Sequence, residues 1–242
     1  MKNIQFLIAT LGVLFAKAVC AENDFVVYSP YVVQGKNELE VKAFGQRDAR
    51  YELNNVSGYN LSVAHAFTSW WKPEVYLVAY NREPGEKYQP SGYEFENTFQ
   101  LTTQGEYWAD LGLLVSYAHN RQPGVSSAAE FELLFEKLSG HFDQRLNLIW
   151  GKQIGAGASG AFAFRSSYSL SYNIHDEKAS YAPSIEAYYR PGDNAYQIGP
   201  VFSGELRTAH GSELEYSLGV IYGINTSAPN KTLLARIAYE FF

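Results

Sequence analysis

Apolar and polar residues alternate along most of the chain. In residues 213–224 every second residue from Leu214 to Ile224 is aliphatic or aromatic, and residues 161–174 largely repeat this pattern. A period of two residues is typical of a β-strand whose two faces meet different surroundings. No run of 18 apolar residues follows position 21, so the pattern predicts strands and no membrane-spanning helix.

Alternating segments of about ten residues recur along the whole chain, separated by connectors that are alternately short and longer. The predicted strands are 37–47, 57–68, 73–83, 92–103, 106–118, 128–139, 142–152, 160–174, 180–190, 195–207, 212–225 and 231–242. Short turns on one side and longer loops on the other, with an even strand number, are typical of bacterial transmembrane barrels. We therefore predict an all-β fold, a single antiparallel transmembrane β-barrel of about 12 strands.

The amino-terminal residues have the features of a secretory signal peptide. Lys2 precedes an apolar run from Ile4 to Ala16, and small residues surround position 21. A lipoprotein signal is the alternative because Cys20 is nearby, but Lys17 does not fit that motif. We expect residues 1–21 to be cleaved, residues 22–36 to form a periplasmic segment, and residues 37–242 to form the barrel.

The composition supports a membrane barrel over a soluble one. Aromatic residues make up 16% of the chain and charged residues only 18%, with a formal net charge of −6. The high apolar content excludes disorder, and the acidic charge argues against a nucleic-acid partner. A secreted sandwich or lipocalin-like barrel would also alternate, but its exposed face would carry more charge. Here the second face is mainly Ser, Gly, Ala, Asn and Thr, which suits a polar lumen.

Aromatic residues gather near the predicted strand ends, where they would lie at the two membrane interfaces. The residues predicted for these girdles are Trp70, Trp71, Tyr107, Phe142, Trp150 and Tyr181. This position would bring them against outer-membrane lipids and lipopolysaccharide.

The last strand carries a resemblance to a known class. The chain ends in Leu-Leu-Ala-Arg-Ile-Ala-Tyr-Glu-Phe-Phe, and it resembles the closing strand of Gram-negative outer-membrane β-barrels, which ends in an aromatic residue. The resemblance implies a bacterial outer-membrane location and recognition of Tyr239, Phe241 and Phe242 by the barrel-assembly machinery. If Phe241 and Tyr239 face the lipid, Glu240 and Arg236 face the lumen, where charged residues are less costly. Phe242 is then one residue longer than the usual closing strand, which ends on its last lipid-facing aromatic residue. Residues 25–44 also resemble the start of uncharacterised outer-membrane proteins.

Inward-facing acids outnumber inward-facing bases. Four acids, Glu94, Glu96, Glu130 and Glu132, are predicted to gather toward the outer end. The predicted lumen bases are Arg82, Arg145, Arg165, Arg190 and Arg236. Clustered like charges are costly without water or cations, so we expect a hydrated, cation-preferring outer vestibule. The alternative is that acids and bases pair and fill the lumen.

No catalytic or metal site is predicted. A nucleophilic serine needs an activating histidine within hydrogen-bond reach, and the one His-x-Ser sequence, His210-Gly211-Ser212, falls in a turn. His65 is the one histidine within a predicted strand, and no serine lies two positions away. The histidines are scattered without paired spacing, and Gly155–Gly160 lacks the lysine of a phosphate loop, so no metal or other cofactor is expected.

The sequence thus predicts a narrow channel or uptake pore for small polar or cationic solutes, with both termini in the periplasm. A structural or surface-interaction barrel with a filled lumen is the first alternative. A lipid-modifying outer-membrane enzyme is the second. The oligomeric state cannot be predicted from these patterns.

Overall fold

The computed structural model describes residues 25–122, 124–155, 158–176, 178–208 and 211–242. The predicted signal peptide and His210 lie outside the described residues. No helix among the described residues is long and apolar enough to cross a bilayer.

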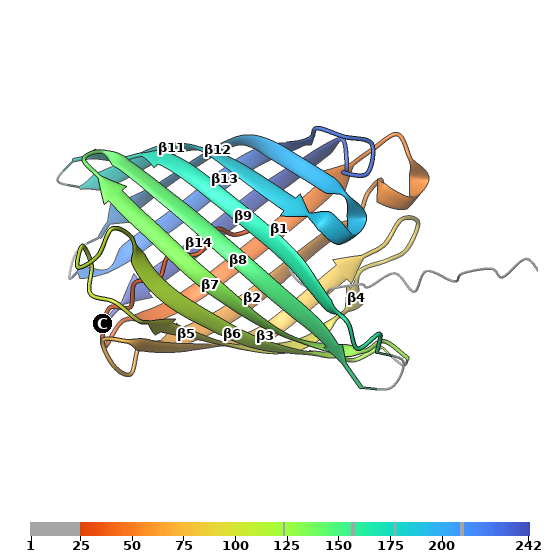
Figure 1. The fold of residues 1–242 in the computed structure, drawn as a ribbon, viewed down its shortest axis with the longest axis horizontal. Helices are drawn as coiled ribbons and strands as arrows, with labels where there is room; N and C mark the ends of the chain where they lie inside the picture. Colours follow the sequence, from red (N-terminus) through yellow and green to blue (C-terminus); the bar gives the residue numbers. More distant parts are fainter. Residues whose placement is uncertain (1–24, 123, 156–157, 177, 209–210) are drawn as a thin grey trace, which may run out of the picture.

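Twelve long antiparallel strands form a closed barrel (Figure 1), which confirms the predicted fold class. The long strands are β1 (Asn37–Arg47), β2 (Ser57–His65), β3 (Trp71–Arg82), β5 (Gly92–Gln100), β6 (Asp110–Asn120), β7 (Ser127–Ser139), β8 (Phe142–Ile154), β9 (Phe162–Tyr172), β11 (Ala179–Arg190), β12 (Ala195–Arg207), β13 (Glu213–Gly223) and β14 (Lys231–Phe241). Two short strands, β4 (Gln89–Pro90) and β10 (Ile174–His175), extend the sheet beside β3 and β11, and the 3-10 turns η1 (Tyr51–Leu53) and η2 (Pro191–Asp193) lie in connectors.

The first and last strands close the barrel. β1 pairs with β14 over its full length, from Asn37 opposite Phe241 to Arg47 opposite Lys231. β9 and β11 pair directly with each other as well. Closure gives every long strand two neighbours, so its backbone N–H and C=O groups form hydrogen bonds within the wall. Lipid could not provide these hydrogen bonds.

The connectors define two ends of the barrel. We call the end with connectors 66–70, 101–109, 140–141, 173–178 and 208–212 the turn end, and the opposite one the loop end. The carboxyl terminus lies at the turn end (Figure 1). The connector predicted at 104–105 spans 101–109 instead, because the backbone N–H groups of Leu101 and Thr102 both bond to the carbonyl of Leu111 and the regular ladder stops there.

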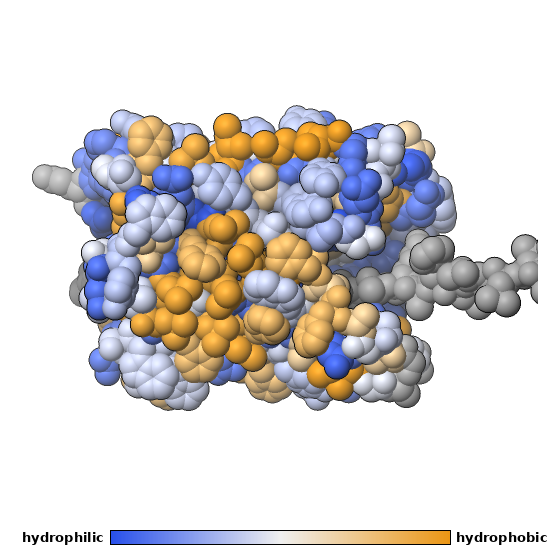
Figure 2. Space-filling model, in the orientation of Figure 1, coloured by the Kyte–Doolittle hydropathy of each residue, from blue (hydrophilic) through white to orange (hydrophobic). Residues whose placement is uncertain are grey.

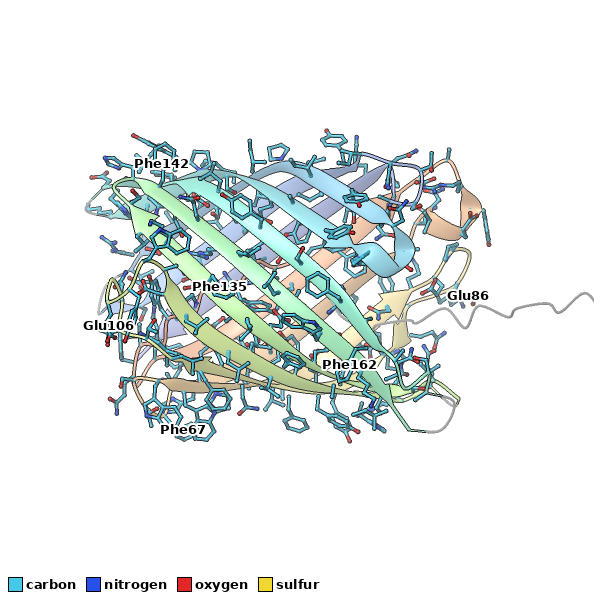
Figure 3. All side chains as sticks on the ribbon, in the orientation of Figure 1. Phe67, Glu86, Glu106, Phe135, Phe142 and Phe162 are labelled. Carbon is cyan, nitrogen blue, oxygen red and sulfur yellow. The ribbon has the colours of Figure 1, made fainter. Side chains whose placement is uncertain are left out.

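The outer surface of the wall is apolar at mid-height. Leu77, Ile185 and Leu218 are each more than half exposed although they lie within strands. Figure 2 shows apolar side chains gathered over the middle of one face, with hydrophilic residues toward both ends. Aromatic residues lie outside near the ends, as Phe67 and Phe142 do in Figure 3. This distribution suits a hydrocarbon layer between two polar interfaces.

The predicted girdle residues take up positions on this surface. Trp70, Phe142, Tyr181 and Tyr107 are exposed at the turn end. Trp71 stacks on Phe67 at the same end, whereas Trp150 stacks on Phe131 toward the loop end. Their role as membrane anchors stays a prediction.

The last strand has the facing expected from its sequence. Tyr239 and Phe241 point outward and stack with ring centroids 5.5 Å apart, while Glu240 is buried on the inner face. Phe242 lies beyond β14 and is 70% exposed. Recognition of these residues during assembly stays a prediction.

The N-terminal segment, residues 25–36, runs through the barrel interior (Figure 1). Phe25 lies in the loop half, with its ring 5.8 Å from that of Phe44 and 5.2 Å from that of Tyr188. The segment then descends to the turn end, where the N–H of Gly35 bonds to the carbonyl of Ala66 and β1 begins. It forms no strand of the wall.

Residues 25–36 therefore lie inside the barrel, whereas residues 22–36 were expected to form a periplasmic segment; residues 22–24 lie outside the described residues. The physical reason is burial: Phe25, Val27 and Val32 are apolar and become buried only inside the barrel. Pro30 lacks the N–H that a central wall strand would need, so the segment lies against the wall instead of joining it.

Candidate functional site

An apolar cluster closes part of the loop half. Phe25 and Val27 of the N-terminal segment pack among the inward side chains of Tyr188, Val201 and Ile221. These residues come from β11, β12 and β13, so the segment seals against that side of the barrel.

The four predicted lumen acids occupy the opposite wall of the loop half. Glu96, Glu130 and Glu132 are buried, and Glu94 is half-buried beside them on β5. Glu130 forms an ion pair with Arg165, two strands away on β9. Gly151 on the intervening β8 makes this possible, because a Cβ there would lie only 2.4 Å from the Glu130 carboxylate. The acids and bases expected on separate walls are therefore brought together.

Tyr28 and Lys42 occupy the centre of the lumen. The Lys42 ammonium donates to the hydroxyls of Tyr28 and Tyr76 and lies 2.9 Å from a Glu40 oxygen. The cavity between this group and the acids has a volume of about 30 Å³, which holds about one or two waters. The acids therefore border a small cavity, and the hydrated, cation-preferring vestibule expected beside them stays a prediction.

The other predicted bases lie in different surroundings. Arg82, at the loop end, covers the Tyr88 ring, and Arg190 lies 5.5 Å from the Phe25 ring centroid. Arg145 is near the turn end, paired with Asp143 on its own strand and with a buried carboxylate of β7. The structure therefore distributes the predicted bases along the whole height of the barrel.

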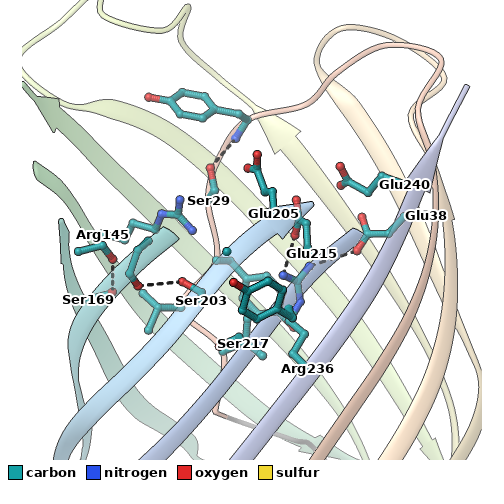
Figure 4. A pocket seen from close by; sticks show the side chains of 18 of the residues that line it. Ser29, Glu38, Arg145, Ser169, Ser203, Glu205, Glu215, Ser217, Arg236 and Glu240 are labelled. Atoms are coloured by element: carbon teal, nitrogen blue, oxygen red, sulfur yellow. Dashed lines mark hydrogen bonds and ion pairs between the residues drawn. The ribbon is translucent and has the colours of Figure 1, made fainter. Parts of the chain in front are cut away.

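The large cavity lies in the turn half. This vestibule has a volume of about 440 Å³ and is bounded by the N-terminal segment and by inward side chains of β8 to β14 and of β1, β3 and β5 (Figure 4). Its wall carries serines 169, 171, 180, 203 and 217 between charged side chains. Such a volume is in the usual range of small-molecule sites.

Every base at the vestibule mouth is paired with carboxylates. Arg236 bonds to Glu40 and Glu215 and lies 3.3 Å from a Glu38 oxygen. Lys36 pairs with Glu240 and Glu213. Burial disfavours the Lys36 ammonium, but these two carboxylates raise its pKa above the ordinary value. The pairs tie the lower end of the N-terminal segment to β13 and β14.

His65 has a structural environment. Its Nδ1 lies 2.9 Å from Oδ1 of Asn37, and its ring packs edge-on against Phe67 at the turn end. Among the described residues no group of three or more His, Cys, Asp or Glu side chains could hold a metal ion.

The comparisons with known proteins support the fold. No protein-family model matches the chain. No curated protein sequence matches it either. Solved structures do match: an outer membrane channel from Pseudomonas putida F1 has a TM-score of 0.57 at 14% identity, covering 91% of this chain and 99% of that chain. The translocator domain of the autotransporter NalP from Neisseria meningitidis has a TM-score of 0.55 at 9% identity, covering 87% and 89%.

The NanC porin is a further match, with a TM-score of 0.50 at 10% identity, covering 84% of this chain and 99% of that chain. At these identities the likeness concerns the fold alone. The chain has the fold of an outer-membrane β-barrel.

Proposed function

We propose that this protein is a channel of the bacterial outer membrane for small polar or cationic solutes, gated by its N-terminal segment. The observation that supports this most is the 440 Å³ vestibule, which is polar, continuous with the turn-end mouth and closed above by the segment. Outer-membrane lipids and lipopolysaccharide would surround the apolar wall, and the barrel-assembly machinery would insert it. The channel role is proposed in preference to an enzymatic one.

The segment suits a gate because it is held by side-chain contacts and not by a β-ladder. The Tyr28 backbone bonds to Asn147, the N–H of Val32 to Gln100, and the Tyr31 hydroxyl to Asp110. Apolar burial of Phe25, Val27 and Val32 adds to these bonds, but none of these contacts belongs to the strand ladder, so the segment can leave without unfolding the wall.

A filled structural barrel is the second candidate. The buried cluster around Phe25 and the Glu130–Arg165 pair favour it, because together they occlude the loop half. In that case the lumen would stay closed in every state.

Conductance in planar bilayers distinguishes the gated channel from the filled structural barrel. A Cβ added at Gly112 would lie 2.6 Å from the Cβ of Pro30, so Gly112→Val should displace the segment without changing charge. We expect rare openings in the parent chain and a larger open fraction in Gly112→Val. Gly45→Val is the matched control, since a Cβ at Gly45 meets Ser57 at an ordinary 4.0 Å. No conductance in any of the three folded proteins would favour the filled barrel.

A further inference from the structure

We propose that the outer face of the barrel has, at its loop end, a binding site for the phosphate groups of lipopolysaccharide. The site is formed by Arg47, Arg82 and Lys231, with Tyr88 and Tyr222 beside them. It goes beyond the channel proposed above, because it needs the membrane location of the barrel and not its transport role.

Arg47 and Lys231 lie directly opposite each other in the seam between β1 and β14. Residues an even number of positions apart in a regular strand share a face. Arg47 therefore lies on the side of Val41, and Lys231 on the side of Leu233, and both of these apolar residues are exposed on the outer surface. Like charges directly opposite each other destabilise a sheet, so a bound anion would stabilise this pair.

Arg82 also faces outward, although it was predicted to line the lumen. It lies an even number of positions after the inward Glu74, but a β-bulge in the pairing of β3 with β2 adds one residue, Leu77, between them. The alternation is shifted by one beyond the bulge. Arg82 is therefore opposite Ser57, on the face of the exposed Tyr59.

Asn55, in the connector before β2, links the two arginines. Its side-chain oxygen accepts from Nη1 of Arg47 at 2.5 Å, and its carbonyl oxygen accepts from Nε of Arg82 at 3.2 Å. Its φ of 62° lies in the left-handed region, which asparagine adopts more readily than most residues. Because the register holds Lys231 beside Arg47, the three cations form one cluster.

No carboxylate in the described part of the chain forms an ion pair with any of these three cations. Asp48 follows Arg47 directly, but other donors occupy both of its oxygens. Its Oδ1 accepts from Nε and the backbone N–H of Arg50, and its Oδ2 accepts from Arg50 and from the backbone N–H of Asn230. The positive charge of the cluster is therefore available to an anion from outside the protein.

Two exposed tyrosines flank the cations. The Lys231 ammonium lies 5.7 Å from the ring centroid of Tyr222, and the Arg82 guanidinium lies 5.0 Å from that of Tyr88. Such contacts position a cation while leaving its other side accessible. Tyrosines are also enriched at the level of lipid headgroups. The cluster therefore lies where the apolar band of the wall ends and the headgroup layer begins.

A phosphorylated lipid suits this position better than a free anion. The planar fork of an arginine matches two phosphate oxygens, and a lysine adds a compact charge. Val41 and Leu233 lie below the cations on the same strands, where the acyl chains of the same lipid would pack. The loop end has mostly the longer connectors and lies opposite the carboxyl terminus (Figure 1), as the extracellular end of a barrel does. The leaflet that contains lipopolysaccharide would therefore surround the cluster.

Native mass spectrometry of the full chain in detergent tests the site. The probes are lipid A with two phosphates, which is the membrane anchor of lipopolysaccharide, the same lipid A with its phosphates removed, and inorganic phosphate. We expect the phosphorylated lipid to bind at least about tenfold more tightly than the dephosphorylated one, and an equimolar amount of inorganic phosphate not to displace it.

Variants assign the binding to the cluster. Lys231→Gln should weaken binding of the phosphorylated lipid about tenfold, the usual effect of losing one charged hydrogen bond, and leave the dephosphorylated lipid unchanged. Arg47→Gln combined with Arg82→Gln should abolish the preference for the phosphorylated form. Lys152→Gln is the matched control: Lys152 also covers an aromatic ring, that of Phe162, at the loop end, but no cation lies opposite it. This change should alter the affinity by less than about twofold.

The variants are compared as folded barrels, verified by heat-dependent gel mobility. Equal binding of the two forms of lipid A, an unchanged affinity in the double arginine variant, or an equal loss in Lys152→Gln would overturn the site. Displacement of lipid A by equimolar inorganic phosphate would overturn the lipid headgroup as its ligand. None of these measurements depends on conductance, so the site and the proposed channel can fail separately.

Discussion

One buried amide joins the N-terminal segment to the middle of the wall. Asn147 of β8 is fully buried, and its side chain bonds to both backbone groups of Tyr28. The Tyr28 N–H donates to Oδ1 at 2.7 Å, and Nδ2 donates to the Tyr28 carbonyl at 3.1 Å. The amide thus takes the place of a neighbouring strand. We predict that Asn147→Ala releases the segment.

The size of the effect follows from these two bonds. Each buried hydrogen bond contributes about 0.5–1.5 kcal/mol net, so their loss should weaken docking by about 1–3 kcal/mol. That corresponds to an increase of about 5- to 150-fold in the population with the segment undocked. The wall should stay folded, because the backbone ladder of β8 with β7 and β9 does not use this side chain.

A thiol reporter measures this population without reference to transport. The chain has one cysteine, so Val27→Cys in a Cys20→Ser background places a single thiol on the buried part of the segment. A charged maleimide should alkylate it slowly in the parent, and faster by the factor given above in Asn147→Ala.

Gln197→Ala is the matched control, since this buried amide bonds to Thr232 of the wall and not to the segment. Equal alkylation rates in the Asn147 and Gln197 variants would refute the reasoning. So would rapid alkylation in the parent, because the segment would then be undocked from the start.

Three further predictions concern assembly, charge and pH. Deleting Phe241 with Phe242 should impair outer-membrane assembly much more than deleting Phe242 alone, measured by heat-dependent mobility, because Phe241 alone of the two lies in β14; equal defects would contradict this. Arg236→Met should destabilise the barrel by about 1–3 kcal/mol in urea titrations, since Glu215 loses its partner while Glu38 and Glu40 keep Lys72 and Lys42, whereas an unchanged midpoint would show the network to be dispensable. Hydrogen bonds from Arg50 hold the pKa of Asp48 well below its usual range, so the Asp48 contacts that join connector 48–56 to 224–230 should persist at neutral pH. They should weaken as pH falls below about 4 toward the lower folded pKa. This would be seen as a loss of amide protection, relative to the intrinsic exchange rate at each pH, in both connectors, and Asp48→Asn should remove this dependence.

The wall of the barrel could be predicted from the sequence because its signal is local. Alternation determines which residues face lipid. Phe241, and not Phe242, was predicted to be the last lipid-facing residue because this places Glu240 on the inner face, where the structure has it. The full length of the connector at 101–109 could not be predicted because the sequence of Leu101 and Thr102 continues the strand pattern. Their backbone hydrogen bonds, which both go to the carbonyl of Leu111, do not continue the ladder.

The contents of the lumen could not be predicted in the same way. The pairing of Glu130 with Arg165 crosses a strand and depends on the missing side chain of Gly151, so it needs the register of three strands. The N-terminal segment left one signal in the sequence, an apolar run on both sides of Pro30, just before the first strand. That run shows that the segment needs burial, but the vestibule below it follows only from the diameter and tilt of the closed wall.

The route of the segment also bears on how the barrel forms. Tyr28 and Asn147 are 119 positions apart in the chain, and Phe25 meets Tyr188 still later. The segment therefore completes its contacts only when most strands have been added, and such long-range contacts form late and slowly. Because β1 follows directly after the segment and must still join β14, we expect seam closure and filling of the interior to be a single event. A barrel assembled in this order would enter the membrane already sealed and would not leak while it folds.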